Sequence, residues 1–462
     1  MNKPLIHIGR PPPPSFEQAK NKRQKVRAAG LDPNYWYAVE YSKRVKPGQV
    51  TEVTFWRRSV ALFRGQDGVL RAVENRCAHR QLKLSIGRVE DCQLVCPYHG
   101  WTYDCTGACV RIPQQPDLQI PGNARVTAYR AQEKYGYVWV ALDEPLRPIP
   151  DFPEDGKPGY RRIFQFYEEW KTSPVRMMEN SFDNSHFSFV HKANFGILDN
   201  PKPAPYEFHE TDYGFEAETL VPIKNPPASY AITGTTEAIT HRHLVNRYYL
   251  PFCRRFGCSY PASGRDHIIY NCATPIDDGR MMLVQWLYRN DTEADCPAQT
   301  LIDFDFEITR EDKEIIESTD PDAMVDASRH GVEYSMPSDK PGMIMRKQLL
   351  ALLREHGEEP VEVPDDVRAL PENEGLEALA DAPDGRLVAI AETQVSSGIA
   401  ALGTGTTGVT GLLDQADELG IPVAVASSSC STCCTSLGTA RTAMTVRALA
   451  TTGVSISGGG GS

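Results

Sequence analysis

The 462-residue sequence lacks the long apolar segments of a membrane-spanning protein. It has no run of about 18 or more consecutive apolar residues, and its N-terminus has no apolar signal core. The first residues instead carry a run of prolines followed by basic side chains, which are Lys20, Lys22, Arg23, Lys25 and Arg27. We therefore expect no transmembrane segment, a cytoplasmic location, and a basic, Pro-rich N-terminal arm over residues 1–34.

The sequence also has too little positive charge for a broad nucleic-acid-binding surface. Its formal net charge is −11 at pH 7, so we expect no nucleic-acid partner. No Gly-rich dinucleotide motif follows a predicted strand, and no second cysteine cluster has plant-ferredoxin spacing. Any electrons that the protein uses must therefore come from another protein. Because no secretory signal is present, its 12 cysteines indicate reduced thiols or metal ligands and not a disulfide framework.

The segments that are present predict two globular domains of the α+β class. Short runs rich in Val, Tyr, Trp and Phe alternate with turn signals over residues 35–148, which predicts an antiparallel β domain. Five closely spaced prolines predict a linker at its end: Pro145, Pro148, Pro150, Pro153 and Pro158. Residues 149–360 mix helical and strand patterns, which predicts a domain with an antiparallel sheet and not a βαβ array. Residues 361–462 read as a linker and a low-complexity, disordered tail.

Two Cys-plus-His pairs lie inside the β region. Cys77-x-His79 is followed by 16 residues and then by Cys96-x-x-His99. A Rieske [2Fe–2S] cluster uses this donor set, with thiolates on one iron and imidazoles on the other. A Cys₂His₂ zinc site is the alternative, but Cys-x-His spacing is awkward for zinc. We therefore predict a Rieske cluster at these four residues. The nearby Trp101 is either a shield of the cluster against water or an ordinary core residue.

A second motif reads Glu-Asn-Ser-Phe-Asp-Asn-Ser-His-Phe-Ser-Phe-Val-His over residues 179–191. Asp183 and His186 are three apart, so a continuous helix would place them on one face. His186 and His191 are five apart, which a regular helix would splay by about 140°. If both bind one metal, the helix must end or distort between them. Two imidazoles and a carboxylate would form the triad of non-haem Fe(II) oxygenases.

The carboxylate that would complete this triad is left open by the residue pattern. The run Leu301–Phe306 alternates like a strand, with Asp303 and Asp305 on its polar face. Thr309 is a plausible N-cap of a following helix that carries Asp312 in its first turn. Each of the three acids is a candidate. Five aromatic side chains suggest an apolar, cyclic or aromatic substrate: Phe182, Phe187, Phe189, Tyr230 and Trp286. Packing in the protein core explains these side chains equally well.

Together these motifs make residues 35–350 resemble the α subunits of Rieske non-haem iron oxygenases. The match rests on the cluster motif with its His-Gly-Trp ending and on the Glu-Asn-x-x-Asp-x-x-His-x₄-His motif of residues 179–191. The segment Glu311–Glu317 resembles the stretch that carries the family's third iron ligand, so the resemblance favours Asp312. It implies a Rieske domain, a helix-grip (START-like) catalytic domain, and a head-to-tail ring that is usually a homotrimer.

The resemblance also implies a terminal oxygenase fed by a partner protein. The implied cofactors are a [2Fe–2S] Rieske cluster and a mononuclear Fe(II) held by His186, His191 and Asp312. The implied partners are O₂, a small-molecule substrate, and an external NAD(P)H-dependent reductase or ferredoxin. Asp183 is implied to accept hydrogen bonds from His186 and from His99 of the partner subunit, which would link the two metal centres.

The reaction that the resemblance implies is hydroxylation of an apolar, cyclic or aromatic small molecule, and two alternatives to it remain. The same iron centre can carry out demethylation or desaturation. The second alternative is a Rieske-type electron carrier or redox sensor with an inert second domain. Iron content separates an oxygenase from an electron carrier or sensor, because an oxygenase needs about three irons per chain and a carrier needs about two.

Overall fold

The computed structural model describes residues 32–277, 279–319 and 333–355, together with five short strands nearer the C-terminus. These strands are β18 (Leu376–Asp381), β19 (Leu387–Ala391), β20 (Val423–Ser427), β21 (Thr435–Leu437) and β22 (Val454–Ser457). They form a two-stranded and a three-stranded sheet, and they belong to a different compact unit from the two domains considered below. The expected basic arm and the rest of the expected tail lie outside the described residues.

The first domain contains two antiparallel sheets. The larger has the order β1-β10-β9-β4-β3-β2 and comprises β1 (Tyr37–Tyr41), β2 (Val50–Phe55), β3 (Arg58–Arg64), β4 (Leu70–Glu74), β9 (Ala128–Lys134) and β10 (Tyr137–Ala141). The smaller lies between β4 and β9 in the chain and comprises β5 (Arg88–Glu90), β6 (Gln93–Val95), β7 (Thr102–Tyr103) and β8 (Cys109–Arg111). Their shared apolar core includes Phe63 and Leu94 and also contains Cys77 and Cys96. The cluster motif therefore lies where the two sheets meet.

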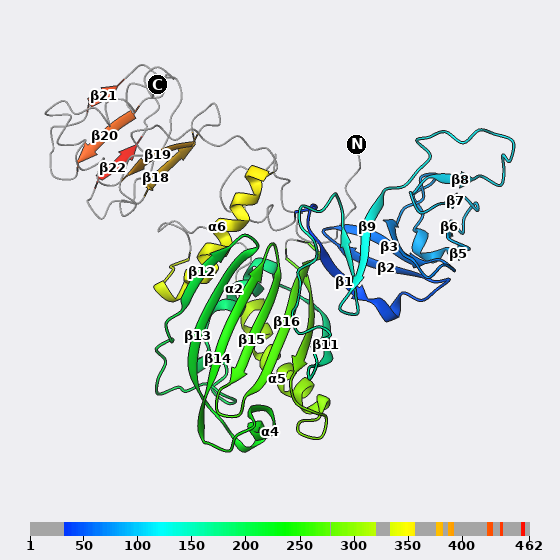
Figure 1. The fold of residues 1–462 in the computed structure, drawn as a ribbon. Coiled ribbons are helices and arrows are strands. Elements are labelled where there is room, and N and C mark those ends of the chain that lie inside the picture. Colours follow the sequence, from blue (N-terminus) through cyan, green and yellow to red (C-terminus); the bar gives the residue numbers. More distant parts are fainter. Residues whose placement is uncertain are drawn as a thin grey trace. The chain divides into compact units, whose positions relative to one another are not determined.

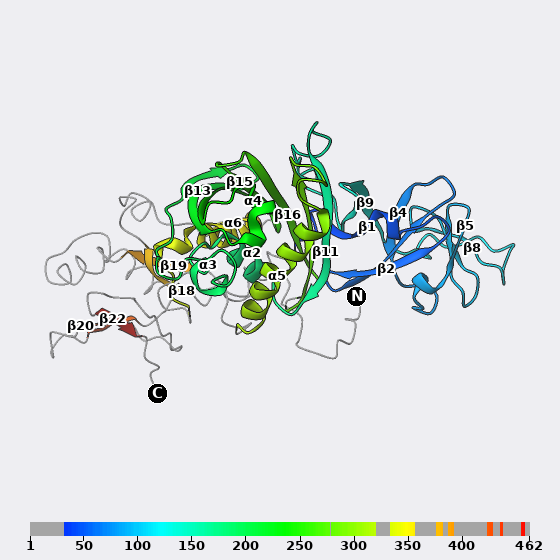
Figure 2. The same ribbon diagram turned by 90° about the horizontal axis from the view of Figure 1, so that it is seen from below.

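The second domain is built on one seven-stranded antiparallel sheet. Its order is β11-β17-β16-β15-β14-β13-β12, formed by β11 (Arg161–Trp170), β12 (Glu207–Thr211), β13 (Gly214–Lys224), β14 (Ile239–Tyr249), β15 (Cys253–Tyr260), β16 (Arg265–Pro275) and β17 (Met281–Arg289). Its helices are α2 (Pro174–Phe182), α3 (Phe187–Val190), α4 (Tyr230–Thr233), α5 (Ala298–Glu317) and α6 (Lys340–Glu355). Figures 1 and 2 show α2, α5 and α6 against one face of this sheet. The α+β class with a helix-covered antiparallel sheet is confirmed.

Strand alternation sets the chemistry of the sheet face that meets the helices. Every second residue of β14 points inward, so Arg242, Leu244 and Asn246 are buried. Strand β15 follows the same rule, and its inward residues include Arg254. The inner face of the sheet is therefore part apolar core and part polar surface.

The proline-rich linker runs between Ala141 at the end of β10 and Arg161 at the start of β11. Its side chains are anchored on the second domain: Phe152 stacks against Tyr270 with ring centroids 4.1 Å apart. Arg255 pairs with the buried Glu154 of the linker at 2.6 Å, and Tyr270 donates a hydrogen bond to the same carboxylate. Burial and ion pairing thus tether the linker to the sheet.

Two local predictions are wrong. The sequence of residues 228–235 predicts a short strand, but the chain there forms a 3₁₀ turn (Pro227–Ser229) followed by α4. The expected strand Leu301–Phe306 and the expected helix start at Thr309 are both interior parts of α5, which begins at Ala298 after Pro297. Alternating polarity over six residues cannot separate a strand from a helix. Here the segment is helical and packs against β11 as part of α5.

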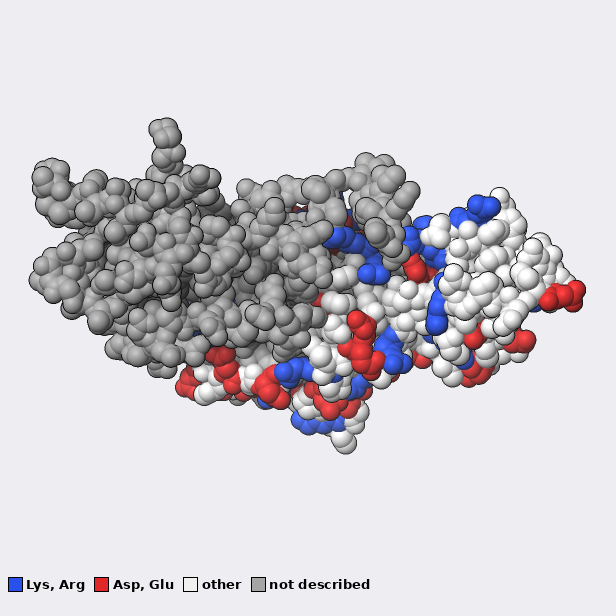
Figure 3. All heavy atoms as spheres, turned by 90° about the horizontal axis from the view of Figure 1, so that it is seen from above, with Lys and Arg blue, Asp and Glu red and all other residues white. Residues whose placement is uncertain are grey.

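No helix among the described residues is long and apolar enough to cross a membrane. Acidic and basic side chains are interspersed on the described part of the face drawn in Figure 3. This distribution agrees with the acidic net charge of the whole sequence.

Candidate metal centres and the adjoining cavity

The helix that carries the second motif begins and ends at identifiable residues. Ser173 is the N-cap of α2, where its hydroxyl accepts a hydrogen bond from the Arg176 amide at 3.1 Å. The helix ends at Phe182, and Asp183 is its C-cap with extended backbone. Asp183 and His186 are therefore not on one helical face, contrary to the simplest interpretation of their spacing.

A turn, not a helix, brings Asp183 and His186 together. The Asp183 carboxylate accepts a hydrogen bond from the Ser185 amide at 2.6 Å, and its Oδ2 lies 3.0 Å from His186 Nδ1. His186 is then the N-cap of the one-turn helix α3, and His191 is its C-cap. The expected interruption between the two histidines is thus present, and it lets both rings turn towards one point.

The ring nitrogens of these histidines converge on one carboxylate of α5. Asp312 Oδ1 lies 3.4 Å from His186 Nε2 and 3.3 Å from His191 Nε2. Among the described residues, these three side chains form the one group of three or more His, Cys, Asp or Glu whose donor atoms lie within 4.8 Å of one another. Two imidazoles and one carboxylate at this separation are the donor set of a two-His-one-carboxylate iron site, so the residues fit a mononuclear iron.

A second carboxylate, which the residue pattern had not singled out for a role, orients His191. Glu311 Oε2 lies 2.7 Å from His191 Nδ1 and also accepts a hydrogen bond from Asn194 at 3.4 Å. Burial by itself would lower the pKa of His191, but Asp312 and Glu311 outweigh it and raise that pKa. Each histidine thus has a carboxylate at Nδ1, which leaves Nε2 free to face the common point.

The other two acids considered for the triad have different surroundings. Asp303 is exposed and accepts a hydrogen bond from Gln299, one turn earlier in α5. Asp305 is buried and accepts hydrogen bonds from His267 Nε2 at 2.8 Å and from Gln165 Nε2 at 2.5 Å. Neither belongs to the convergent group, so the geometry favours Asp312.

The four residues of the first motif also converge. His79 Nδ1 and His99 Nδ1 lie 3.1 Å apart, while Cys77 and Cys96 are buried on the core side of the same loops. Burial raises the pKa of the Cys96 thiol, and the neighbouring Cys77 raises it further. Two thiolates side by side repel each other, and a metal cation bound between the sulfurs would offset this repulsion. Two thiolates and two imidazoles on paired loops fit a Rieske cluster.

Two aromatic residues complete this site. Trp101 stacks on His79 with ring centroids 4.7 Å apart and an interplanar angle of 2°, so it covers one ring face. Tyr103, which the sequence analysis had not identified, lies with its hydroxyl 3.1 Å from Cys77 Sγ and accepts a hydrogen bond from the Ala78 amide at 3.0 Å. Trp101 thus covers His79 and also packs against the apolar core, so both of its predicted roles stay open.

A cavity extends from the three-residue group along the inner face of the sheet. It encloses about 810 Å³ of empty space, the part open to solvent included, and is lined by residues of α2, α3, α5, β11 and β14–β17. Of the five aromatic residues suggested from the sequence, only Phe187 lines it; Phe182 and Trp286 are core residues and Phe189 is exposed. The aromatic lining comes instead from Trp170, Phe195, Phe256, Tyr260 and Phe304.

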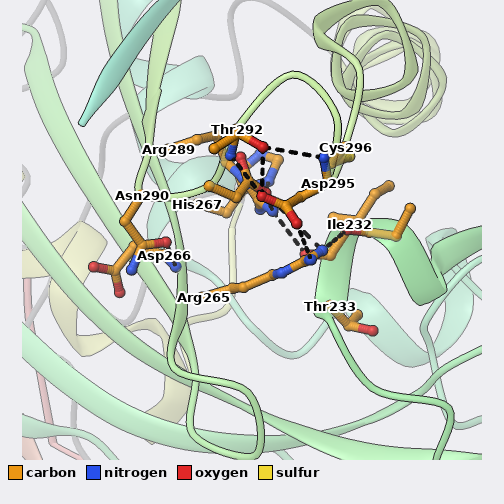
Figure 4. Close-up of polar contacts among 12 residues, drawn as sticks. Ile232, Thr233, Arg265, Asp266, His267, Arg289, Asn290, Thr292, Asp295 and Cys296 are labelled. Atoms are coloured by element: carbon orange, nitrogen blue, oxygen red, sulfur yellow. Dashed lines mark hydrogen bonds and ion pairs between the residues drawn. The ribbon is translucent and has the colours of Figure 1, made fainter. Parts of the chain in front are cut away.

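A buried polar network supports the far side of this cavity. Arg289 Nη1 donates to His267 Nδ1 at 3.2 Å, so His267 carries its hydrogen on Nε2 and donates it to Asp305. Figure 4 shows Arg289 and His267 side by side, near the end of α4 at Ile232, whose carbonyl accepts a hydrogen bond from Arg289 at 3.0 Å. The Asp305 carboxylate is thereby fixed in orientation.

Comparison with known protein families agrees with both centres. A model of the Rieske [2Fe-2S] domain matches residues 35–126, and a model of the vanillate O-demethylase oxygenase C-terminal domain matches residues 170–355. The chain is 31% identical over 296 residues to methylxanthine N1-demethylase NdmA of Pseudomonas putida, covering 62% of this chain and 78% of that protein. It is 42% identical over 180 residues to 4beta-methylsterol monooxygenase of Methylococcus capsulatus, covering 37% and 48%.

Solved structures give the same picture. Pseudomonas putida NdmA in complex with caffeine superposes with a TM-score of 0.60 at 26% identity, covering 73% of this chain and 94% of that one. Dicamba monooxygenase bound to dicamba superposes with a TM-score of 0.60 at 22% identity, covering 70% and 98%, and shows likeness of fold alone.

Proposed function

The chain belongs to the Rieske non-haem iron oxygenases, and on this premise we propose that it oxidises a methyl-bearing cyclic small molecule and releases the methyl carbon. Membership makes it an oxidoreductase and the terminal component of an oxygenase system, with a Rieske [2Fe–2S] cluster and a mononuclear iron. The relatives support demethylation: two act on methylxanthines and one is a methylsterol monooxygenase. The single observation that carries the proposal is the convergence of His186, His191 and Asp312 at the cavity wall.

Removal of an N- or O-methyl group has a defined balance. One oxygen atom of O₂ inserts into a methyl C–H bond, and the hemiaminal or hemiacetal that results breaks its C–N or C–O bond to release formaldehyde. The second oxygen atom leaves as water, which consumes two electrons and two protons. An external reductase or ferredoxin, drawing on NAD(P)H, supplies the electrons.

We assign the metal ligands to the residues that converge. Cys77, His79, Cys96 and His99 would hold the cluster, while His186, His191 and Asp312 would hold the mononuclear iron. When bound, the iron supplies O₂ activation and the cluster supplies single electrons.

The chain's own residues prepare this site for its metal. Asp183 and Glu311 accept the Nδ1 hydrogens of His186 and His191, which keeps both Nε2 lone pairs directed at the common point. The aromatic lining of the cavity excludes water from the side where substrate would lie.

Electron transfer between subunits is a further part of the proposal. We expect a homotrimeric ring in which Asp183 also accepts a hydrogen bond from His99 of the partner subunit. About 28% of the Asp183 side chain is exposed in the single chain, so it has room for a second donor. An Asp183→Asn enzyme should load both metals yet form product at least about tenfold more slowly. Full product formation by a metal-replete variant would contradict the bridging role.

The test of function is anaerobic reconstitution with iron and sulfide, followed by a product screen with a surrogate reductase. Methyl-bearing heterocycles and aryl methyl ethers should release formaldehyde in step with NAD(P)H use. Hydroxylated products without formaldehyde would show that the protein is a hydroxylase and not a demethylase. A reconstituted protein that accepts electrons but consumes no O₂ with any substrate would instead favour an electron carrier or sensor.

A further inference from the structure

Two arginines of the sheet project into the cavity beside the proposed iron site. Arg242 of β14 is 6% exposed and Arg254 of β15 is 8% exposed, and both line the cavity. Buried guanidinium groups are costly unless a partner offsets the lost hydration. Their presence in a largely aromatic cavity therefore requires an explanation.

Neither arginine has a carboxylate partner among the residues that the structure describes. Arg254 Nε donates a hydrogen bond to Asn246 Oδ1 at 2.9 Å, and this amide oxygen is a neutral acceptor. Arg242 Nε is buried without any hydrogen-bond acceptor. By contrast, the arginines on the outer face of the same strands are paired, Arg247 with Glu216 and Arg255 with Glu154.

The two carboxylates that line the cavity are engaged elsewhere. Asp312 faces the two histidine Nε2 atoms, and Asp305 receives hydrogen bonds from His267 and Gln165. Burial lowers the pKa of Arg254 to about 9, although Tyr206 and Asp312 oppose this. Burial by itself would also lower the pKa of Arg242, but the neighbouring Tyr260 and Cys258 outweigh it and raise that pKa.

The guanidinium planes are also positioned for a ligand. Arg242 lies over the Phe195 ring with its central carbon 4.0 Å from the centroid, and Arg254 lies over Phe256 at 4.4 Å. Stacking on a ring occupies one face of a guanidinium and leaves the N–H groups on its edge available. Edge N–H groups in a fixed fork are the donors that bind carboxylates in a bidentate manner.

Strand register pairs Arg254 with Tyr248, which is six residues along β14 from Arg242, so the two arginines lie at different points of the cavity wall. Resting on the proposed function, we propose that the substrate is an anion whose carboxylate is bound by Arg254, with its oxidisable methyl group directed at the His186–His191–Asp312 group. Sheet register places Asn271 opposite Arg254, and Gln285 opposite Asn271. These two amides also line the cavity, and Asn271 Oδ1 is buried with no hydrogen-bond partner. The row adds neutral polar groups beside Arg254, whose guanidinium lies over the Phe256 ring.

This inference narrows the substrate class beyond the apolar ring that the sequence suggested. An aromatic or heteroaromatic acid matches this combination of a buried cation and aromatic rings. A neutral isostere would leave the buried Arg254 guanidinium without a counter-charge, and the binding site should therefore discriminate strongly against it.

The experiment compares acids with their amides on the iron-loaded, full-length protein without O₂. The probes are 4-methoxybenzoate with 4-methoxybenzamide, and 6-methoxy-2-naphthoate with its amide, titrated by isothermal calorimetry. At least one acid should bind about tenfold or more tightly than its amide, because a hydrogen-bonded charge pair contributes on the order of 1.5–3 kcal/mol. Amides that bind as tightly as the acids, or no acid that binds with Kd below about 1 mM, would overturn the proposal.

Variants locate the binding group. R254Q should weaken the acid about tenfold or more and leave the amide within about threefold, while R254K should recover part of the loss because it keeps the charge. R247Q is the matched control, since Arg247 lies on the neighbouring strand β14 but faces outward and pairs with Glu216. Equal loss for acid and amide in R254Q would show a structural role and refute the assignment.

The outcome is separable from that of the proposed function. Tight acid binding by a three-iron protein that consumes no O₂ would refute the oxygenase proposal and leave the anion site intact. Demethylation of neutral substrates with no preference for acids would refute the anion site and support the oxygenase proposal.

Discussion

At the scale of single residues, the iron site depends on a carboxylate behind each histidine. A neutral imidazole can present a lone pair to a metal only at the nitrogen that does not carry hydrogen. Asp183 and Glu311 receive the Nδ1 hydrogens of His186 and His191, so both tautomers are set before metal binds. Of these two acids, Asp183 was identified from the sequence, because it is three residues from its histidine. Glu311 is 120 residues from His191 and only the fold brings them together.

This arrangement predicts the effect of Glu311→Gln. A neutral amide is a weaker acceptor for the His191 Nδ1 hydrogen, so the affinity for mononuclear iron should fall by about 10- to 100-fold. Iron content after dialysis against a graded chelator measures this change. The control is Glu314→Gln, because Glu314 is an exposed residue on the same helix. Unchanged iron retention in the Glu311 variant would show that His191 needs no carboxylate.

At the scale of elements, sequence reasoning succeeded where local chemistry decides the structure. The start of α2 followed from Ser173 and Pro174, and the break between the histidines followed from their five-residue spacing. Sequence reasoning failed where packing between residues far apart in the chain decides the structure. Residues 301–312 were divided into a strand and a new helix, whereas they are one helix that carries both Asp305 and Asp312 into the cavity. The inward arginines of β14 and β15 were also missed, because a charged residue in a strand gives no signal of the face it occupies.

The linker gives a prediction at the same scale. Burial by itself would raise the pKa of Glu154, but the Arg255 guanidinium and the Tyr270 hydroxyl outweigh it and hold the pKa below its ordinary value. The ion pair therefore contributes stability above the unfolded-state pKa of about 4.3, and this contribution is lost as pH falls through the lower folded-state pKa. Glu154→Gln should destabilise the protein by about 3 kcal/mol at pH 7, because it leaves the largely buried Arg255 without its counter-charge.

Chemical denaturation at several pH values tests this expectation. The difference in unfolding free energy between wild type and Glu154→Gln should be largest near neutral pH and should shrink below about pH 4, where the wild-type carboxylate also loses its charge. Arg162→Gln is a suitable control, because Arg162 pairs with the neighbouring Asp155 at the surface. A stability difference that is constant with pH would show that hydrogen bonding, and not charge, tethers the linker.

At the scale of the whole molecule, two sites of different chemistry lie in one compact unit. A pair of thiolates and a pair of imidazoles occupy loops of the first domain, and a His-His-Asp group lies between the helices and sheet of the second. Family matches cover both regions and end at residue 355. The order of the two motifs was readable from the sequence because each is local. The cavity between helices and sheet was not, because its lining comes from eight separate helices and strands.

The most direct test of the account is the amount of iron and acid-labile sulfide in the purified protein, with Asp312→Asn measured beside it. We expect about three irons and two sulfides per chain in the wild type. The Asp312 variant should hold about two irons and keep the electron paramagnetic resonance signal of the reduced cluster, while Asp303→Asn should match the wild type. A wild-type protein with two irons, or with zinc in place of iron and sulfide, would contradict the account.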